Sequence, residues 1–377
     1  MNFYNHLKNK TNTNRKNLIF LLPNFSIGGA GNSILNLCKN INYQNYNISI
    51  ISVGKNSYKK KFLNLSAKVI ELKKNKLIYS IFKIKKIIIK NTKQNKTYLI
   101  SNINYANVIS CIFFNSIKNL KLILIERTPI QELQFYNSFC DYIKKKIIKI
   151  CMKFFYRRAH YIIGNSSNVC KDVNKYCKVK SYKILPYINF NKKNKIKRIN
   201  SAVNITWIGR NTEEKNIDDF LYSLKYLNYK KIKINIISNI KINFLKYHIQ
   251  KAIIKKIFIK KIEISKTLNI YKKSHILIST SLYEGFPNVV AEAINYKCLI
   301  ITSNSYGGIN DLIKNNSYGL IYNVKDPENL ADKINKAINS YKLQKNKIIK
   351  ANKNLENLAK NYNNKYLIFF NKITNDN

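Results

Sequence analysis

The sequence predicts an α/β fold made of two similar domains, each with a mainly parallel sheet covered by helices. Short apolar runs of strand length alternate with segments of helical period along most of the chain. This alternation stops at residues 191–200, which are polar, charged and without an apolar pattern, and then starts again. A length of 377 residues also exceeds what one ordinary core holds. We therefore expect two domains whose sheets face each other across a cleft.

The first half of the chain is expected to form an N-terminal domain at residues 17–190, after a polar tail at 1–16. Its β-branched runs predict strands at residues 17–24, 45–54, 97–103, 120–127 and 160–166. A glycine-rich turn at residues 26–31 leads from the first strand into a helix. Helical segments between successive strands are typical of a parallel sheet.

The second half repeats the pattern as a C-terminal domain at residues 201–350, joined through a linker at 191–200. Its predicted strands are residues 203–210, 232–239, 256–264, 275–281, 298–304 and 318–324. A helix opens at Asp326-Pro327. Residues 351–377 carry apolar side chains at helical spacing, and we expect a C-terminal helix that crosses back to the N-terminal domain. Ligands of such sheets bind at the carboxyl ends of the strands, which places the site in the cleft.

The chain is strongly basic, with 68 Lys and Arg residues against 18 Asp and Glu residues and a formal net charge of +50. One interpretation is a compositional bias that leaves the lysines as solvated surface. The other is attraction to an anionic partner, such as an anionic lipid surface, a phosphorylated substrate or nucleic acid. The tyrosines are dispersed and no nucleic-acid-binding module is recognisable, which argues against nucleic acid.

The sequence favours a cytoplasmic protein. The first residues are polar and basic without an apolar core, unlike a secretory signal. No uninterrupted apolar run reaches membrane-spanning length. The seven cysteines form no C-x-x-C pair, so reduced thiols are expected rather than a disulfide scaffold or a zinc site.

The strand at residues 203–210 ends in Gly209-Arg210, and Lys215 stands just before the next helix. Glycine lets the backbone turn tightly at a strand end. Arg210 and Lys215 are therefore candidates to bind a diphosphate at the cleft, the guanidinium as a fork and the ammonium as a point charge. They also fit a solvated surface, as two of 68 basic residues.

Within the stretch SLYEGFPNVVAEAINYK, residues 281–297, two glutamates frame a Gly-Phe-Pro-Asn turn and an apolar run. Pro287 suits the first turn of a helix over residues 288–296, whose free N–H groups favour phosphate. Glu284 precedes this helix and Glu292 lies about one turn inside it. The apolar neighbours of Glu292 predict burial, so its carboxylate needs a partner, and vicinal sugar hydroxyls would serve. The alternative is that Glu284 stabilises the helix N-terminus by its charge and that Glu292 lies on the surface.

Other signals in the sequence are weaker. Gly307-Gly308 precede Asp311 at another strand-to-helix turn. No G-x-G-x-x-G, Walker, H-E-x-x-H or D-x-D motif occurs. His160 and His275 open apolar strands, as expected of structural histidines.

These stretches together resemble the retaining glycosyltransferases of family 4, which have the GT-B fold of two Rossmann-like domains. The resemblance covers residues 17–334. Residues 284–293, EGFPNVVAEA, are similar to the family's E-x7-E signature. Residues 207–220 resemble its Gly-Arg…Lys segment and residues 307–313 its Gly-Gly…acid turn. In the N-terminal half, residues 24–37 resemble its Gly-Gly-Ala loop.

The resemblance implies that Glu284 is the catalytic residue, in contact with the donor sugar near the reacting carbon. The residues implied to bind the nucleotide-sugar donor are Gly28, Gly29, Arg210, Lys215, Gly285, Phe286, Pro287, Asn288, Val289 and Glu292. Within this set, Arg210 and Lys215 hold the diphosphate and Glu292 holds the ribose. Arg127 is a candidate acceptor or phosphate contact, because its strand end resembles that of members that build surface polysaccharide.

The reaction implied is transfer of a sugar from a nucleotide sugar, usually UDP-linked, with retention at the anomeric carbon. The acceptor is a glycan, expected to be linked to polyprenyl diphosphate, in the synthesis of a surface polysaccharide such as O antigen or capsule. No metal and no cofactor are implied, in agreement with the missing D-x-D triplet. The sequence departs from the family at Gly31, where many members have an acid, and at Lys297-Cys298-Leu299, which replaces Gly-x-Pro.

Two segments of the N-terminal half are basic and apolar together, residues 77–96 and 141–161. Basic amphipathic helices suit a membrane face. We therefore hypothesise peripheral attachment to the inner face of the cell membrane, beside a lipid-linked acceptor. Ordinary helices with lysine surfaces are the alternative. For the activity, the alternatives are another nucleotide-sugar enzyme of the same fold, such as an epimerase, or a non-catalytic homologue.

Overall fold

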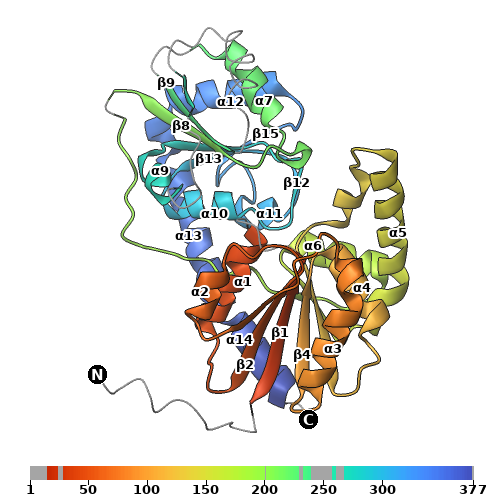
Figure 1. The fold of residues 1–377 in the computed structure, drawn as a ribbon. Coiled ribbons are helices and arrows are strands. Elements are labelled where there is room, and N and C mark those ends of the chain that lie inside the picture. The colour runs from red at the N-terminus through yellow and green to blue at the C-terminus, as the bar shows by residue number, and fades with distance from the viewer. Residues whose placement is uncertain are drawn as a thin grey trace.

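The computed structural model describes residues 15–23, 29–199, 201–228, 232–238, 257–259 and 267–375. Two parallel sheets, each covered by helices on both faces, lie in separate domains (Figure 1). This is the two-domain α/β architecture that the sequence predicts. The predicted tail at residues 1–16 lies almost wholly outside the described residues.

The N-terminal sheet has the strand order β3-β2-β1-β4-β5-β6-β7, and every neighbouring pair is parallel. Its strands are β1 Lys16–Leu22, β2 Tyr46–Ser52, β3 Lys68–Glu71, β4 Thr97–Asn102, β5 Leu120–Glu126, β6 Tyr161–Gly164 and β7 Tyr182–Lys183. All five predicted strands are present. The sequence did not indicate β3 and β7, because both are short and partly exposed and so lack a continuous apolar run.

Helices cover the N-terminal sheet in two layers. One face carries α1 Gly29–Asn40, α2 Lys59–Leu63 and the C-terminal α14 Lys365–Asn375. The other face carries α3 Ile81–Thr92, α4 Asn104–Phe113, α5 Phe139–Phe155 and α6 Ser167–Cys177. Three short 3₁₀ turns join these elements: η1 Leu77–Ser80, η2 Ile130–Gln134 and η3 Tyr156–Arg158.

The C-terminal sheet has the order β10-β9-β8-β11-β13-β15, again with parallel neighbours. Its strands are β8 Val203–Ile208, β9 Ile232–Ile237, β10 Ile257–Ile259, β11 Ile276–Ser279, β13 Leu299–Ser303 and β15 Leu320–Tyr322. A separate parallel pair, β12 Tyr283–Glu284 and β14 Tyr306–Gly307, follows the carboxyl ends of β11 and β13. Strands of two residues leave no periodic signal, which is why the sequence did not reveal this pair.

The helices of the C-terminal domain also form two layers. One face carries α7 Ile217–Ser223 and α12 Pro327–Asn339, with η4 Glu213–Lys215, η5 Leu224–Tyr226 and η7 Tyr341–Gln344 nearby in the chain. The other face carries α9 Thr267–Lys273, α10 Asn288–Asn295, α11 Ile309–Leu312 and α13 Lys345–Tyr362. Asp326 caps α12 by accepting a hydrogen bond from the Asn329 backbone N–H at 2.9 Å, as its sequence predicts.

The chain crosses between the domains twice, and the two crossings touch. After β7, Ile188 exchanges two hydrogen bonds with the Asn363 side chain, at 2.8 and 2.9 Å. Asn363 lies between α13 and α14, so the region expected to be one helix is two. α14 returns to the N-terminal core, where the Ile373 carbonyl accepts from the buried Tyr98 hydroxyl at 2.9 Å.

Membrane-spanning helices, clusters of metal ligands and disulfide bonds are all absent from the described residues. Across these ranges, every helix is too short or too polar to cross a bilayer. The same residues contain no group of three His, Cys, Asp or Glu side chains arranged to hold a metal ion. All seven cysteines are free thiols.

Candidate functional site

The backbone of Lys215 is fixed at the carboxyl end of the C-terminal sheet by a chain of two hydrogen bonds. The indole N–H of Trp207, on β8, donates to the Thr280 hydroxyl oxygen at 2.9 Å. That hydroxyl in turn donates to the Lys215 carbonyl at 2.7 Å. Trp207 and Thr280 are both about 1% exposed, so this chain of hydrogen bonds fixes the position from which the lysine side chain extends.

Glu284 meets Lys215 at the end of β12. The two side chains form a short ion pair, and each is less than one-fifth exposed. The Ser281 hydroxyl donates to the same carboxylate oxygen at 2.9 Å. The Glu284 carbonyl accepts from the Gly308 backbone N–H at 2.8 Å. The structure thus brings together two of the predicted site residues and adds Ser281, which the sequence did not single out.

The glycine pair that the sequence treated as a weak signal has a clear role in this arrangement. Gly307 has a φ of +122°, which side chains rarely adopt, and a Cβ there would lie 1.8 Å from the Glu284 carbonyl oxygen. At Gly308 a Cβ would lie 2.0 Å from the Gly285 carbonyl oxygen. Only glycine therefore lets β14 approach the loop that carries Glu284.

Glu292 lies on α10 and is largely buried, as its neighbours predict. Its carboxylate accepts a hydrogen bond from the Tyr271 hydroxyl at 2.8 Å. Burial raises the pKa of Glu292, and this hydrogen bond opposes the shift. Tyr271, on α9, is the partner that the sequence required but could not name. Pro287 stands directly before α10 at its N-cap position, as expected.

Arg210 and Lys215 do not converge in this structure. Lys215 pairs with Glu284, whereas Arg210 pairs with Glu214 at 2.5 Å. The Arg210 side chain is 65% exposed, because it follows the end of β8 in a loop that projects into solvent. A small pocket behind the Lys215–Glu284 pair is lined by Trp207, Ile208, Lys215, Ser279, Thr280, Ser281, Glu284, Pro287, Val289 and Val290. The Phe286 side chain is instead buried in the core of the domain.

Glycines bring the N-terminal domain against this site. Gly29 begins α1, and a Cβ on it would lie 2.8 Å from the Asn288 side-chain nitrogen. Gly285 touches the other domain more closely, since a Cβ there would lie 1.5 Å from the Arg127 carbonyl oxygen. Gly28, the other glycine expected here, lies outside the described residues.

Arg127 lies at the end of β5 with an unbalanced charge. Its Nε and Nη2 atoms both donate to the Asn102 side-chain oxygen, at 3.0 and 2.9 Å. Among the described residues it forms no ion pair with a carboxylate. Burial lowers the pKa of the guanidinium. The arrangement leaves a partly buried cation that an anionic ligand would complement.

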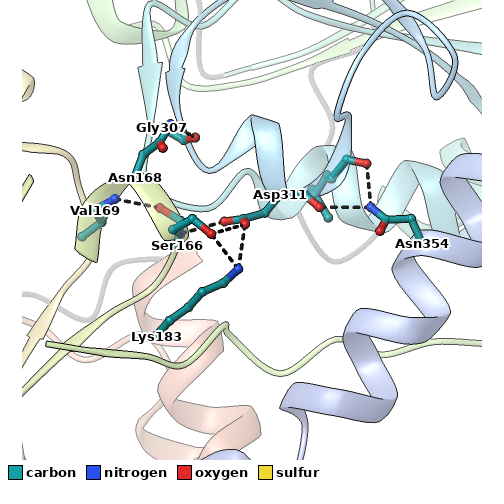
Figure 2. Close-up of polar contacts among 9 residues, drawn as sticks. Ser166, Asn168, Val169, Lys183, Gly307, Asp311 and Asn354 are labelled. Atoms are coloured by element: carbon teal, nitrogen blue, oxygen red, sulfur yellow. Dashed lines mark hydrogen bonds and ion pairs between the residues drawn. The ribbon is translucent and has the colours of Figure 1, made fainter. Parts of the chain in front are cut away.

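The turn that contains Asp311 joins the two domains (Figure 2). The Asp311 carboxylate accepts from the backbone N–H and hydroxyl of Ser167, at 2.8 and 2.6 Å, and from Lys183 at 2.8 Å. Beside it, the Asn168 side chain donates to the Gly307 carbonyl at 3.0 Å. Asp311 was noted in the sequence only as an acid on a helix, whereas its partners come from α6 and β7 of the other domain.

A second contact between the domains lies beside Glu284. The ring of Phe135 packs on that of Tyr283 with centroids 4.9 Å apart. Glu132 lies on η2, shortly before Phe135. Its pKa is raised by burial and by the nearby Glu214 of the other domain. Its Oε2 atom is buried without a hydrogen-bond partner among the described residues. Glu132 is therefore a cleft residue that no motif in the sequence indicated.

A larger hollow lies elsewhere, lined by residues 92–96 and 119–121. These residues lie at the amino ends of β4 and β5, at the opposite end of the N-terminal sheet from Arg127. Because ligands of parallel sheets bind at the carboxyl ends of the strands, we place the candidate site at Lys215, Glu284 and Glu292.

A family comparison matches the C-terminal half of the chain. Residues 189–355 match the family described as glycosyl transferases group 1. The match covers less than half of the chain but includes Lys215, Tyr271, Glu284 and Glu292.

Solved structures show the same fold over nearly the whole chain. HepE of Anabaena, in complex with UDP and glucose, is 12% identical with a TM-score of 0.77, over 94% of this chain and 99% of that one. A glycosyltransferase from Rickettsia africae is 19% identical with a TM-score of 0.76, over 97% of this chain and all of that one. These likenesses confirm the GT-B arrangement of two Rossmann-like domains.

A curated relative matches a shorter segment. It is the Campylobacter jejuni GalNAc-α-(1→4)-GalNAc-α-(1→3)-diNAcBac-PP-undecaprenol α-1,4-N-acetyl-D-galactosaminyltransferase, 34% identical over 76 residues. The matched segment is 20% of this chain and spans about one-fifth of the relative, 21%.

Proposed function

We propose that this chain is a retaining glycosyltransferase of family 4 that moves a hexose-type sugar from a nucleotide sugar, UDP-linked, to a glycan acceptor. The observation that carries the proposal is the Lys215–Glu284 pair, which lies beside Glu292 in the segment that matches the glycosyltransferase family. A cation for the diphosphate and carboxylates for sugar hydroxyls are the groups that such a donor needs.

The donor binds in the C-terminal domain. Lys215 exchanges the Glu284 carboxylate for the diphosphate, and the exposed Arg210 swings from Glu214 to the same phosphates. The N-terminal N–H groups of α10, at residues 288 and 289, add to this anion site. Glu292 accepts hydrogen bonds from the ribose hydroxyls, each worth about 1.5–3 kcal/mol because the acceptor is charged. The charge of the diphosphate is thus met by residues of the chain, without metal or cofactor.

In the reaction, the bond between the anomeric carbon and the diphosphate oxygen breaks, and the acceptor oxygen bonds to the carbon on the same face. The acceptor proton passes to the departing phosphate oxygen. Glu284, freed from Lys215, contacts the sugar near the reacting carbon. Gly29 and Gly285 let the two backbones close on the sugar, since neither has a side chain in the way.

The acceptor enters from the N-terminal domain, where Arg127 forms no ion pair with a carboxylate of the described residues. A guanidinium binds phosphate through paired N–H groups, so Arg127 suits the diphosphate of a polyprenyl-linked glycan. The similarity to an undecaprenol-linked transferase over 76 residues supports such an acceptor. With such an acceptor, we propose that the protein acts in the cytoplasm, at the inner face of the membrane, in the assembly of a surface polysaccharide such as O antigen or capsule.

A UDP-release assay tests the proposal, with a panel of UDP-sugars and short polyprenyl-diphosphate glycans. We expect release that depends on both one donor and one acceptor. Release without a lengthened acceptor product would contradict transfer, and an isomerised UDP-sugar would indicate an epimerase instead. UDP binding is measured in parallel. If UDP binds but is not released from any UDP-sugar, the acceptors tested are inactive; if UDP does not bind, the proposed donor site is wrong.

A further inference from the structure

Helix α5 presents an apolar stripe to solvent. Phe139 is 75% exposed and Ile147 is 55% exposed. The members of the α5 stripe recur every three or four residues and therefore share one face of the helix; they are Phe139, Ile143, Ile147, Ile150 and Phe154. A contiguous exposed apolar surface of this kind marks an interaction site rather than scattered surface residues.

The stripe is not the face by which α5 joins the protein. Met152 is buried in the N-terminal core, and Ile148, Cys151 and Phe155 pack partly against it. Figure 1 shows α5 along the outer edge of the N-terminal domain, on the side that carries α3 and α4. The helix thus has one apolar face for its own core and a second that no described residue covers.

The charges around the stripe are positive. α5 has five lysines and one acidic residue, Asp141, which pairs with Lys145 at 2.9 Å. Lys146 and Lys149 lie over tyrosine rings, an arrangement that keeps their charge. Residues 1–190 contain 34 Lys and Arg residues against five Asp and Glu residues. A second copy of such a chain is repelled, whereas an anionic surface is attracted.

The N-terminal end of the stripe lies next to the cleft. Phe135, four residues before α5, packs on Tyr283, which is the neighbour of Glu284. Tyr136 and Phe139 both pack on Tyr142, with ring centroids 4.9 and 6.3 Å away. Aromatic rings thus continue from Tyr283 onto the stripe, and Tyr136 and Phe139 among them are exposed. Aromatic rings favour the boundary between water and lipid.

We infer that the α5 stripe is the surface by which this protein docks on a bilayer of anionic phospholipid. α5 lies in the plane of the interface, its stripe enters the headgroup and acyl boundary, and lysines on its flanks bind the phosphates. The consequence for catalysis rests on the proposed function: docking through α5 brings the cleft to the membrane surface where a lipid-linked acceptor is held.

Co-sedimentation with vesicles tests the inference without any sugar transfer. The vesicles contain phosphatidylcholine with 30% phosphatidylglycerol, or phosphatidylcholine alone, at low and high salt. The test variant carries Phe139→Ser and Ile147→Ser, and the matched control carries Leu343→Ser, which is 79% exposed in the C-terminal domain. UDP binding by calorimetry shows that each variant is folded and keeps its donor site.

We expect salt-sensitive binding to the anionic vesicles that the double variant weakens by about ten-fold or more and the control leaves unchanged. Equal binding by the double variant would contradict the inference, because charge elsewhere would then suffice. A second result would also contradict it: the original chain does not bind vesicles but self-associates, and the stripe substitutions abolish that self-association. Because UDP binding is measured separately, failure at the membrane is distinguishable from failure of the proposed function.

Discussion

The two domains share one architecture, yet the carboxyl ends of their sheets present opposite chemistry. In the C-terminal domain, carboxylates are matched to specific donors: Glu284 to Lys215 and Ser281, and Glu292 to Tyr271. In the N-terminal domain, the corresponding edge offers a glycine, Gly29, and Arg127, which forms no ion pair with a carboxylate in the part of the chain that the structure describes. The difference fits the proposed function, in which the C-terminal sheet holds the sugar nucleotide and the N-terminal sheet receives an anionic acceptor.

Glu284→Ala is expected to have the largest effect on sugar transfer. On the proposed function, Glu284 contacts the sugar beside the reacting carbon and Lys215 binds the diphosphate. We therefore expect transfer to fall by about three orders of magnitude or more, while UDP affinity changes little. Initial rates and calorimetry measure the two effects. Glu213→Ala, at an exposed position on η4, is the control and should retain activity. Normal turnover of the Glu284→Ala variant would show that Glu284 is not the catalytic residue.

The glycines test whether the domains must close. A Cβ at Gly285 meets a backbone carbonyl of Arg127, whereas at Gly29 it meets only the end of the Asn288 side chain. Gly285→Ala should therefore reduce transfer by about 100-fold, and Gly29→Ala by roughly ten-fold or less, since a side chain can move aside. Transfer rates at saturating donor decide the order. A reversed order would mean that the contact at Gly285 is not needed for catalysis.

Asp311 tests how firmly the two domains are joined. Its carboxylate is partly buried and takes three hydrogen bonds from the N-terminal domain, so Asp311→Asn should cost about 2–3 kcal/mol of unfolding free energy. Denaturant unfolding measures this loss, and a second transition would report separate unfolding of the domains. Glu356→Gln, in an exposed ion pair, should change stability far less. Equal losses would show that the interface does not depend on Asp311.

Glu126 gives the smallest predicted effect and concerns the N-terminal domain alone. It is 1% exposed and accepts from Tyr156 and Asn107. Burial raises its pKa to about 7, so the folded chain binds a proton that the unfolded chain releases near pH 4.5. The stability contributed by protonated Glu126 should therefore be lost as pH rises from about 4.5 to 7.

The Glu126→Gln variant isolates this effect. The change in unfolding free energy between pH 5.5 and pH 8 should be smaller in the variant by on the order of 1–2 kcal/mol. Urea unfolding at the two pH values measures it. An equal pH dependence of the unfolding free energy in both proteins would show that Glu126 does not titrate between pH 5.5 and pH 8.

The sequence indicated more of the candidate site in the C-terminal domain than in the N-terminal domain, for a physical reason. Glu284, Pro287 and Glu292 lie within one turn and one helix, so their relation is fixed by local geometry and is visible in a short motif. Tyr271 and Ser281 complete the site through tertiary contacts, which no local pattern encodes.

The same reasoning explains what the sequence missed at the domain interface. Asp311 and Lys183 are 128 residues apart in the chain and meet at 2.8 Å only because both sheets present these ends to the cleft. Burial raises the pKa of Glu132, and Glu214 of the other domain adds to the shift. Such pairs follow from the relative placement of two domains, which apolar periodicity does not determine.

Titration of UDP into four forms of the protein tests most directly that the donor site belongs to the C-terminal domain. The original chain is compared with Lys215→Ala, Glu292→Ala and Arg127→Ala. We predict that the first two substitutions weaken UDP binding by about ten-fold or more, because each removes a charge-assisted contact. Arg127→Ala should stay within about two-fold. Loss of UDP binding in the Arg127 variant, with unchanged binding in the other two, would contradict the account.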